Sequence, residues 1–141
     1  MKARRVMFIA NGFSLLELMI TITIISIICV ISVPIYSQHI IYAKRLEAEI
    51  NLIKLASALE KYYLLNNTYQ DVTLEKLRFV ETIANSPYFL QIASATQTDY
   101  LIKAIPLDNQ AQQDTLCASL LLDSDGNKNI TGNGHLTECW Q

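Results

Sequence analysis

Three polar residues near the C-terminus are spaced like the first ligands of a calcium loop. Asp123, Asp125 and Asn127 alternate along the chain, and carboxylate and amide oxygens are the ligands that Ca²⁺ takes. The glycine of such a loop falls at its sixth position, but here Gly126 is fourth, and Gly134 stands where the closing glutamate belongs. The Asp-Gly pair predicts a hairpin turn instead, so we assign no metal here.

The two histidines give no stronger indication of chemistry. Neither His39 nor His135 has a set of companions at metal-ligand spacing. The sequence also has no nucleophile-elbow, phosphate-loop or zinc-protease motif. We therefore predict no catalytic residues, no metal and no cofactor, and we do not expect an enzyme.

Glu17 is the side chain whose position most requires a chemical explanation. No other carboxylate, lysine or arginine lies between Arg5 and Lys44, and Leu18–Tyr36 is uncharged and apolar. A helix rises ~1.5 Å per residue, so this run is long enough to cross a hydrocarbon core of ~30 Å. A charge inside a membrane costs about 2.5–3.5 kcal/mol even on lenient scales. Glu17 is therefore predicted to have a partner of opposite charge.

The segment around Glu17 resembles the class III signal of type IV pilins. The residues that carry the resemblance are Lys2, Arg4, Arg5 and then Gly12-Phe13-Ser14-Leu15-Leu16-Glu17, ahead of the long apolar run. In that family a prepilin peptidase cuts after the glycine and N-methylates the new first residue, which implies cleavage between Gly12 and Phe13. Glu17 and Pro34 then become the fifth and twenty-second residues of the mature chain, where the family carries glutamate and often proline. The short basic leader has the type IVa length.

The resemblance also supplies a partner for Glu17. Cleavage creates an α-amino group at Phe13, and this cation pairs with Glu17 of an incoming subunit, since each charge offsets the desolvation cost of the other. The alternative is that Glu17 interacts with its own Phe13 amine or with first-turn N–H groups, helped by the helix dipole. Pro34 removes one backbone hydrogen bond and is expected to bend the helix or to let it melt locally.

One domain and its membrane anchor account for the 141 residues. The basic leader predicts a cytoplasmic N-terminus and a head on the periplasmic side of the inner membrane. We reject a conventional secretory signal. The apolar region of such a signal is shorter than the run in this chain, and it is not interrupted near its start by a charge such as Glu17. The expected parts are a leader at 1–12, a transmembrane and filament-core half-helix at 13–36, an amphipathic half-helix at 37–65, and a globular head at 66–141.

The helical pattern continues past the apolar segment. Lys44–Leu65 contains no Gly or Pro and is rich in good helix formers. At 100° per residue, one broad apolar face is expected to cover a sheet; it comprises Leu52, Leu55, Ala56, Leu59, Tyr62 and Tyr63. A narrower stripe comprises Leu46, Ile50, Ile53 and Leu64. This stripe either packs against neighbouring subunits or is incidental.

The remainder of the chain predicts a small antiparallel sheet. Asn66–Tyr69 ends the helix, and Leu74–Ile83 allows one short helix with Thr73 as its N-cap. Alternating residues predict strands at 88–93, 100–105 and 117–123, with a polar loop at 108–114. The expected class is α+β, the pilin fold: a long N-terminal α-helix, half transmembrane and half amphipathic, packed on three or four antiparallel strands, with a C-terminal disulfide-bounded loop.

Two of the three cysteines lie in the part expected to face an oxidising exterior. A bond between Cys117 and Cys139 would close a loop. In the chain-entropy description, such a crosslink stabilises the folded protein by about 3 kcal/mol, because it restricts the unfolded chain. The pattern C-x-x-L-x-L-D-x-x-G…C-W, from Cys117 to Trp140, resembles the disulfide-bounded D-region of small PilE-class minor pilins. Cys29 lies within the apolar run and is taken as a small apolar residue.

The charge balance argues against direct binding of nucleic acid. From Lys44 to Gln141 there are eight Lys or Arg and twelve Asp or Glu, a balance of −4. Non-specific DNA binding depends on a basic surface that neutralises phosphates. A local basic patch that binds DNA is the alternative. We expect any part in DNA uptake to be played by the filament and not by the surface of this subunit.

The resemblance implies a minor subunit of a type IV pilus that starts or supports assembly, for adhesion, twitching motility or DNA uptake. Its expected partners are other pilins, the prepilin peptidase, the inner-membrane assembly machinery and, before assembly, the membrane; the mature subunit is expected in the extracellular pilus. A type II secretion pseudopilin is the nearest rival, disfavoured by the cysteine pair and the missing calcium site. A single-pass anchor with a periplasmic binding domain is the other rival, and it predicts no cleavage after Gly12.

Overall fold

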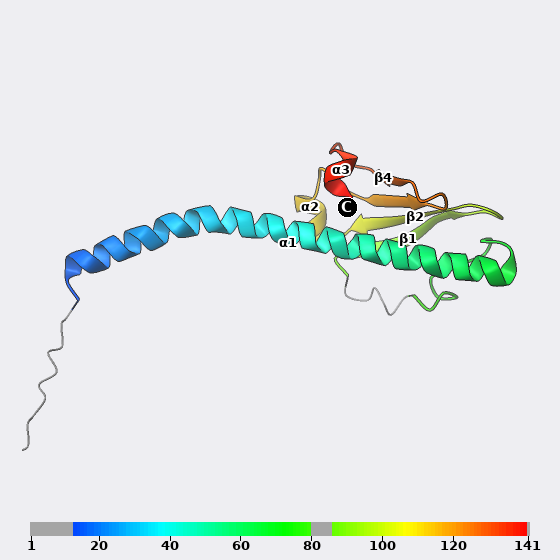
Figure 1. Cartoon of the computed structure of the whole chain (residues 1–141), viewed down its shortest axis with the longest axis horizontal. Helices are drawn as coiled ribbons and strands as arrows, with labels where there is room; N and C mark the ends of the chain where they lie inside the picture. The colour runs from blue at the N-terminus through cyan, green and yellow to red at the C-terminus, as the bar shows by residue number, and fades with distance from the viewer. Residues whose placement is uncertain (1–12, 80–85, 141) are drawn as a thin grey trace, which may run out of the picture. The chain divides into compact units, whose positions relative to one another are not determined.

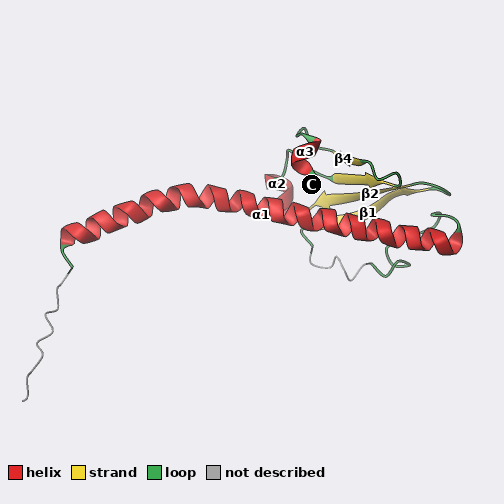
Figure 2. Ribbon diagram, in the orientation of Figure 1, coloured by secondary structure: helices red, strands yellow, loops and turns green. Residues whose placement is uncertain are grey.

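The computed structural model describes residues 13–79 and 86–140. Its elements in chain order are α1 (Leu15–Asn66), β1 (Tyr88–Ala95), β2 (Tyr100–Pro106), α2 (Asp108–Gln113), β3 (Leu120–Asp123), β4 (Lys128–Ile130) and α3 (Leu136–Cys139) (Figures 1 and 2). The chain divides into two compact units, residues 1–37 and 38–141, and α1 contributes to both. We call residues 38–141 the folded unit.

α1 is one helix of 52 residues, which confirms that the helix continues past the apolar segment. It stays helical through Pro34. Beyond its last residue, Asn67 has a φ of 55°, and its N–H donates to the Tyr63 carbonyl over 2.7 Å. Asparagine tolerates this left-handed conformation better than most residues. The Asn66-Asn67 pair therefore ends the helix where the sequence predicts.

The folded unit contains one antiparallel sheet of four strands in the order β1-β2-β3-β4. Phe89 faces Ile105 across the first pair and Ile102 faces Leu122 across the second, with one irregularity between Ile92 and Ser94 in β1. Figure 2 shows the strands lying along the C-terminal half of α1, with α2 and α3 near one end of the sheet. The expected α+β class and strand count are confirmed.

The core lies between the inner face of the sheet and the broad apolar face of α1. Leu52, Leu55 and Leu59 are fully buried, while Ala56, Tyr62 and Tyr63 pack at the edge of the core. The sheet contributes Leu90, Ile102, Ala104 and Leu120. At roughly 25 cal/mol per Å² of apolar surface, burial of one leucine stabilises by about 2 kcal/mol, so this face of α1 is a main source of stability.

Three segments differ from the sequence-based predictions. The polar loop predicted at 108–114 is wrong, because most of it forms α2, with Gln110 buried inside the fold. The strand predicted from Cys117 begins only at Leu120, since Ala118 has a φ of 52° and cannot continue a strand.

The third difference concerns the short helix allowed at 74–83. Residues 74–78 form turns, and residues 80–85 lie outside the described part of the chain. Thr73 still acts like a cap, because its hydroxyl accepts a hydrogen bond from the Lys76 N–H over 3.2 Å. One turn forms here, and Arg78, with a φ of 53°, ends it.

Candidate functional site

The first unit presents an apolar helical surface that nothing in the described chain covers. Among the side chains that the structure describes from Leu15 to Tyr36, the large apolar ones are more than half exposed. α1 is the one helix among the described elements that is long and apolar enough to cross a membrane. Phe13, just before the helix, is 79% exposed. Such an extensive apolar surface requires lipid or other subunits around it.

The serine and threonine hydroxyls of this segment are satisfied within the helix. Thr21, Thr23, Ser26 and Ser32 each donate to the carbonyl four residues earlier, over 2.7–2.8 Å. Glu17 is different, because no described residue forms a hydrogen bond or ion pair with its carboxylate. Since unsatisfied charged groups are costly in lipid, Glu17 needs a partner from elsewhere.

Gly12 lies outside the described residues, so the structure does not place the predicted cleavage site. Pro34 lies within helical backbone, and its role as a bend or melting point stays a prediction. Cys29 is a free, exposed cysteine in the apolar segment.

The narrow stripe on α1 is exposed in the folded unit. Leu46, Ile50 and Ile53 are 38–51% exposed and Leu64 is 78% exposed. The opposite face of the same helix is buried against the sheet. The sheet of this chain therefore does not cover the stripe.

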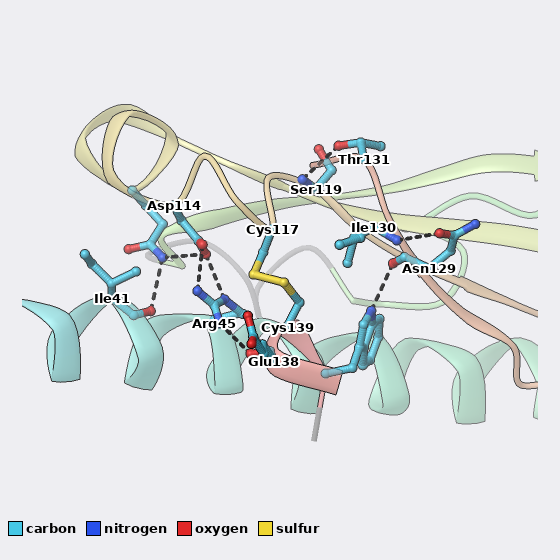
Figure 3. The surroundings of a disulfide bond; sticks show 12 residues. Ile41, Arg45, Asp114, Cys117, Ser119, Asn129, Ile130, Thr131, Glu138 and Cys139 are labelled. Atoms are coloured by element: carbon cyan, nitrogen blue, oxygen red, sulfur yellow. Dashed lines mark hydrogen bonds and ion pairs between the residues drawn. A yellow bond between two sulfur atoms is a disulfide. The ribbon is translucent and has the colours of Figure 1, made fainter. Parts of the chain in front are cut away.

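A polar cluster, which the sequence analysis did not identify, joins α1, β1 and the segment around α2 near the start of the folded unit's helix; three of its members are buried and Arg45 is partly buried. Arg45 on α1 donates from Nε and Nη2 to the two Asp114 carboxylate oxygens, over 2.9 and 2.6 Å (Figure 3). The Tyr88 hydroxyl donates to Asp114 over 2.7 Å. Gln110 donates to the Ile41 carbonyl over 3.1 Å. We call Arg45, Tyr88, Gln110 and Asp114 the polar cluster.

The electrostatics of the polar cluster favour a charged Arg45 and a neutral Tyr88. Burial alone lowers the pKa of Arg45, but the hydrogen bond and charge of Asp114 outweigh it, so the pKa lies above its ordinary value. Burial, and then the hydrogen bond to Asp114, raise the pKa of Tyr88 well above its ordinary range. The Asp114 side chain is 1% exposed, so its charge depends on Arg45 for compensation.

The polar cluster also reaches the disulfide-bounded loop. Arg45 Nη1 donates to the Glu138 carbonyl over 3.1 Å, beside the bond that joins Cys117 to Cys139 (Figure 3). Both cysteines are buried, and the predicted disulfide is confirmed. Trp140, next in the chain, donates from its indole to the Asn129 carbonyl over 2.9 Å. The C-terminal loop is thus fixed to both α1 and the sheet.

No local sequence signal pointed to the polar cluster. Arg45 and Asp114 are 69 residues apart, and each looks like an ordinary surface charge in its own segment. Only the pairing of α1 with the segment after α2 brings them together.

The predicted Asp-Gly turn is confirmed between β3 and β4. Asp123 Oδ1 accepts from the N–H groups of Asp125 and Asn127 over 3.0 and 2.8 Å, and Oδ2 accepts from the Asn127 amide over 2.9 Å. Gly126 takes a φ of 82°, which suits glycine. The Asp123 carboxylate is occupied by the turn, and the described residues contain no group of three metal-ligating side chains.

Comparison with known proteins identifies the family. Residues 34–121, more than half of the chain, match the family described as type IV minor pilin ComP, DNA uptake sequence receptor. The chain belongs to this type IV minor pilin family. Residues 7–33 match the prokaryotic N-terminal methylation motif, which covers Gly12–Glu17 and most of the apolar run of the pilin resemblance. The secretion pseudopilin and the plain membrane anchor are therefore set aside.

A solved minor pilin has a similar fold. The crystal structure of the non-core minor pilin PilV from Neisseria meningitidis aligns with a TM-score of 0.53 and 19% identity, covering 67% of this chain and 89% of that one. A comparison with curated protein sequences gave no match. At this identity the likeness concerns the fold of the minor pilin alone.

Proposed function

We propose that this minor pilin is made as a membrane-anchored precursor, with its N-terminus in the cytoplasm and its head in the periplasm. A prepilin peptidase cleaves it between Gly12 and Phe13 and methylates the new Phe13 amine. The match of residues 7–33 to the methylation motif and the exposed apolar surface of α1 support this proposal. The leader at 1–12 is then removed, and 13–36 serves first as anchor and later as part of the filament core.

Assembly of the filament depends on Glu17. The observation that carries this step is a carboxylate without a described partner on an apolar helix segment whose serine and threonine hydroxyls are satisfied. The Phe13 amine of a neighbouring subunit offers the missing positive charge, and pairing offsets the desolvation cost of both groups. Correctly staggered helices are stabilised, because other staggers leave both charges unpaired.

The filament serves DNA uptake, in line with the family description of a DNA uptake sequence receptor. Two routes are possible, direct contact of this subunit with DNA and an indirect contribution through the filament. The charge balance of −4 from Lys44 to Gln141 argues only against broad, non-specific contact over the whole subunit. Binding of duplex DNA by the full-length protein in detergent micelles distinguishes these routes. Direct contact predicts an affinity for DNA that falls steeply as the salt concentration rises. An indirect contribution predicts no binding of DNA by the isolated protein.

Replacement of Glu17 tests the assembly role. Glu17→Ala in the producing cells is expected to leave cleavage intact but to lower the amount of this subunit in sheared filaments by about tenfold or more, because the Phe13 amine loses its partner. Thr23→Ala, also on the apolar helix, is the matched control and should assemble normally. Equal amounts of the Glu17→Ala and control subunits in filaments would contradict the proposal.

A further inference from the structure

The folded unit has a groove of about 530 Å³ between α1 and the turns at residues 74–78. Its apolar lining includes Ile53, Leu65 and Leu77. Its charged lining is Lys54, Lys61 and Lys76, and none of the described residues that line it carries a carboxylate. A basic groove with apolar walls stands out on a folded unit whose overall charge is negative.

Two of the lysines are available to a ligand. Lys54 and Lys61 are two helical turns apart, about 10 Å along one side of α1. Both are exposed, and in the described part of the chain neither forms a hydrogen bond or an ion pair. Lys76 is different, because its ammonium group donates to the Asp71 carbonyl over 2.5 Å. The helix side of the groove therefore presents two uncompensated charges.

The groove continues into the exposed apolar stripe of α1. Ile53 belongs to both and is 51% exposed. Leu65, at the end of the groove, is 82% exposed, and Leu64 beside it is 78% exposed. Leucines this exposed at the end of a helix favour contact with another protein. A ligand that fills the groove therefore needs negative charges for the lysines and apolar groups for the leucines.

We infer that the groove binds an acidic segment, with apolar side chains beside its carboxylates, on an adjoining pilin subunit. This inference rests on the proposed assembly into a filament. The carboxylates of the segment pair with Lys54 and Lys61, while its apolar side chains cover Ile53 and Leu65. Nucleic acid fits less well, because a phosphate backbone satisfies the lysines and leaves the apolar walls exposed.

Charge reversal in the full-length chain, in cells that make filaments, tests the inference. Lys54→Glu combined with Lys61→Glu is expected to lower the subunit in sheared filaments by about tenfold, since like charges across an interface repel. Lys61→Glu alone should have a smaller effect in the same direction. Lys103→Glu, a matched reversal on β2, should assemble normally. Formation of the Cys117–Cys139 disulfide in each variant shows that the fold is retained.

A photo-crosslinking residue at Leu65 identifies the occupant. The expected product joins Leu65 to an acidic stretch of another pilin, and the double reversal abolishes it. Normal incorporation of the double reversal, or a crosslink to a stretch without carboxylates, would overturn the inference. Weaker binding of duplex DNA by the double reversal, with normal incorporation, would overturn it in favour of a nucleic-acid groove. Failure of the proposed function is distinguishable, because the unmodified subunit is then absent from filaments.

Discussion

Asp114 accepts hydrogen bonds from side chains of three different elements. Arg45 comes from α1, Tyr88 from β1 and Gln110 from α2, with the Gln110 amide 3.3 Å from Asp114 Oδ2. A buried ion pair is weak evidence for stability when compared with apolar packing, but removal of one partner leaves an uncompensated charge. The polar cluster is therefore expected to matter most when one of its members is removed, because the remaining charge then destabilises the fold.

Asp114→Asn is expected to destabilise the processed full-length protein by about 2–3 kcal/mol, because the partly buried Arg45 loses its counter-charge and its charged hydrogen bonds. The measurement is chemical denaturation in detergent micelles. Asp108→Asn, which alters an exposed aspartate at the start of α2, is the control and should change stability by less than about 0.5 kcal/mol. A similar small change for Asp114→Asn would show that the polar cluster is not a determinant of the fold.

Asp123 makes the turn between β3 and β4 sensitive to acid. Hydrogen bonds from Asn127 lower the pKa of Asp123 below its ordinary value of 3.8. A lowered carboxyl pKa gives stability that is present above the ordinary value and is lost as the pH falls through the lowered one. Asp123→Ala should therefore cost about 1 kcal/mol at pH 7, from the lost hydrogen bonds.

The difference between Asp123→Ala and the unmodified protein should be smaller at pH 2 than at pH 7, because the stability that comes from the lowered pKa of Asp123 is lost progressively as the pH falls below 3.8. Thermal unfolding at the two pH values measures it. Asp125→Ala, in the same turn but without a described hydrogen bond to its carboxylate, should show no such pH dependence. An equal cost of Asp123→Ala at both pH values would rule out the carboxylate as the cause.

At the scale of elements, α1 has two apolar faces with different tasks. One is buried against the sheet, and the other is exposed in the folded unit. Replacement of one leucine or isoleucine on each face separates stability from assembly, because only the first face contributes to the core of this chain.

Leu59→Ala is expected to lower the free energy of unfolding by about 2–5 kcal/mol, since it creates a cavity at a fully buried site. Ile50→Ala, at a site that is 45% exposed, should cost less than about 1 kcal/mol but reduce incorporation into filaments. Denaturation and filament shearing measure the two effects. Normal incorporation of Ile50→Ala would show that the exposed stripe does not pack against neighbouring subunits.

Elements were predictable from sequence where a period repeats over many residues. The buried face of α1 and the strands β1 and β2 follow from helical and alternating patterns. α2 was missed because its six residues have no apolar period, and tertiary hydrogen bonds of Gln110 hold it. The start of β3 was missed because the left-handed Ala118 leaves no mark in composition.

At the scale of the whole molecule, the sequence predicted the family and the disulfide but not the polar cluster. Glu17 and the cysteine pair stand out along the chain, since a charge in an apolar run and two exterior cysteines are local signals. The Arg45–Asp114 pair and the lysine groove arise only when distant segments meet. The groove also shows that a negative overall charge conceals a local basic surface.

Determination of the N-terminus and mass of the mature protein from its own cells tests the central claim most directly. A pilin subunit predicts a chain that begins at methylated Phe13, without residues 1–12. A chain that retains Met1 would contradict this account, because no Phe13 amine would then exist to pair with Glu17.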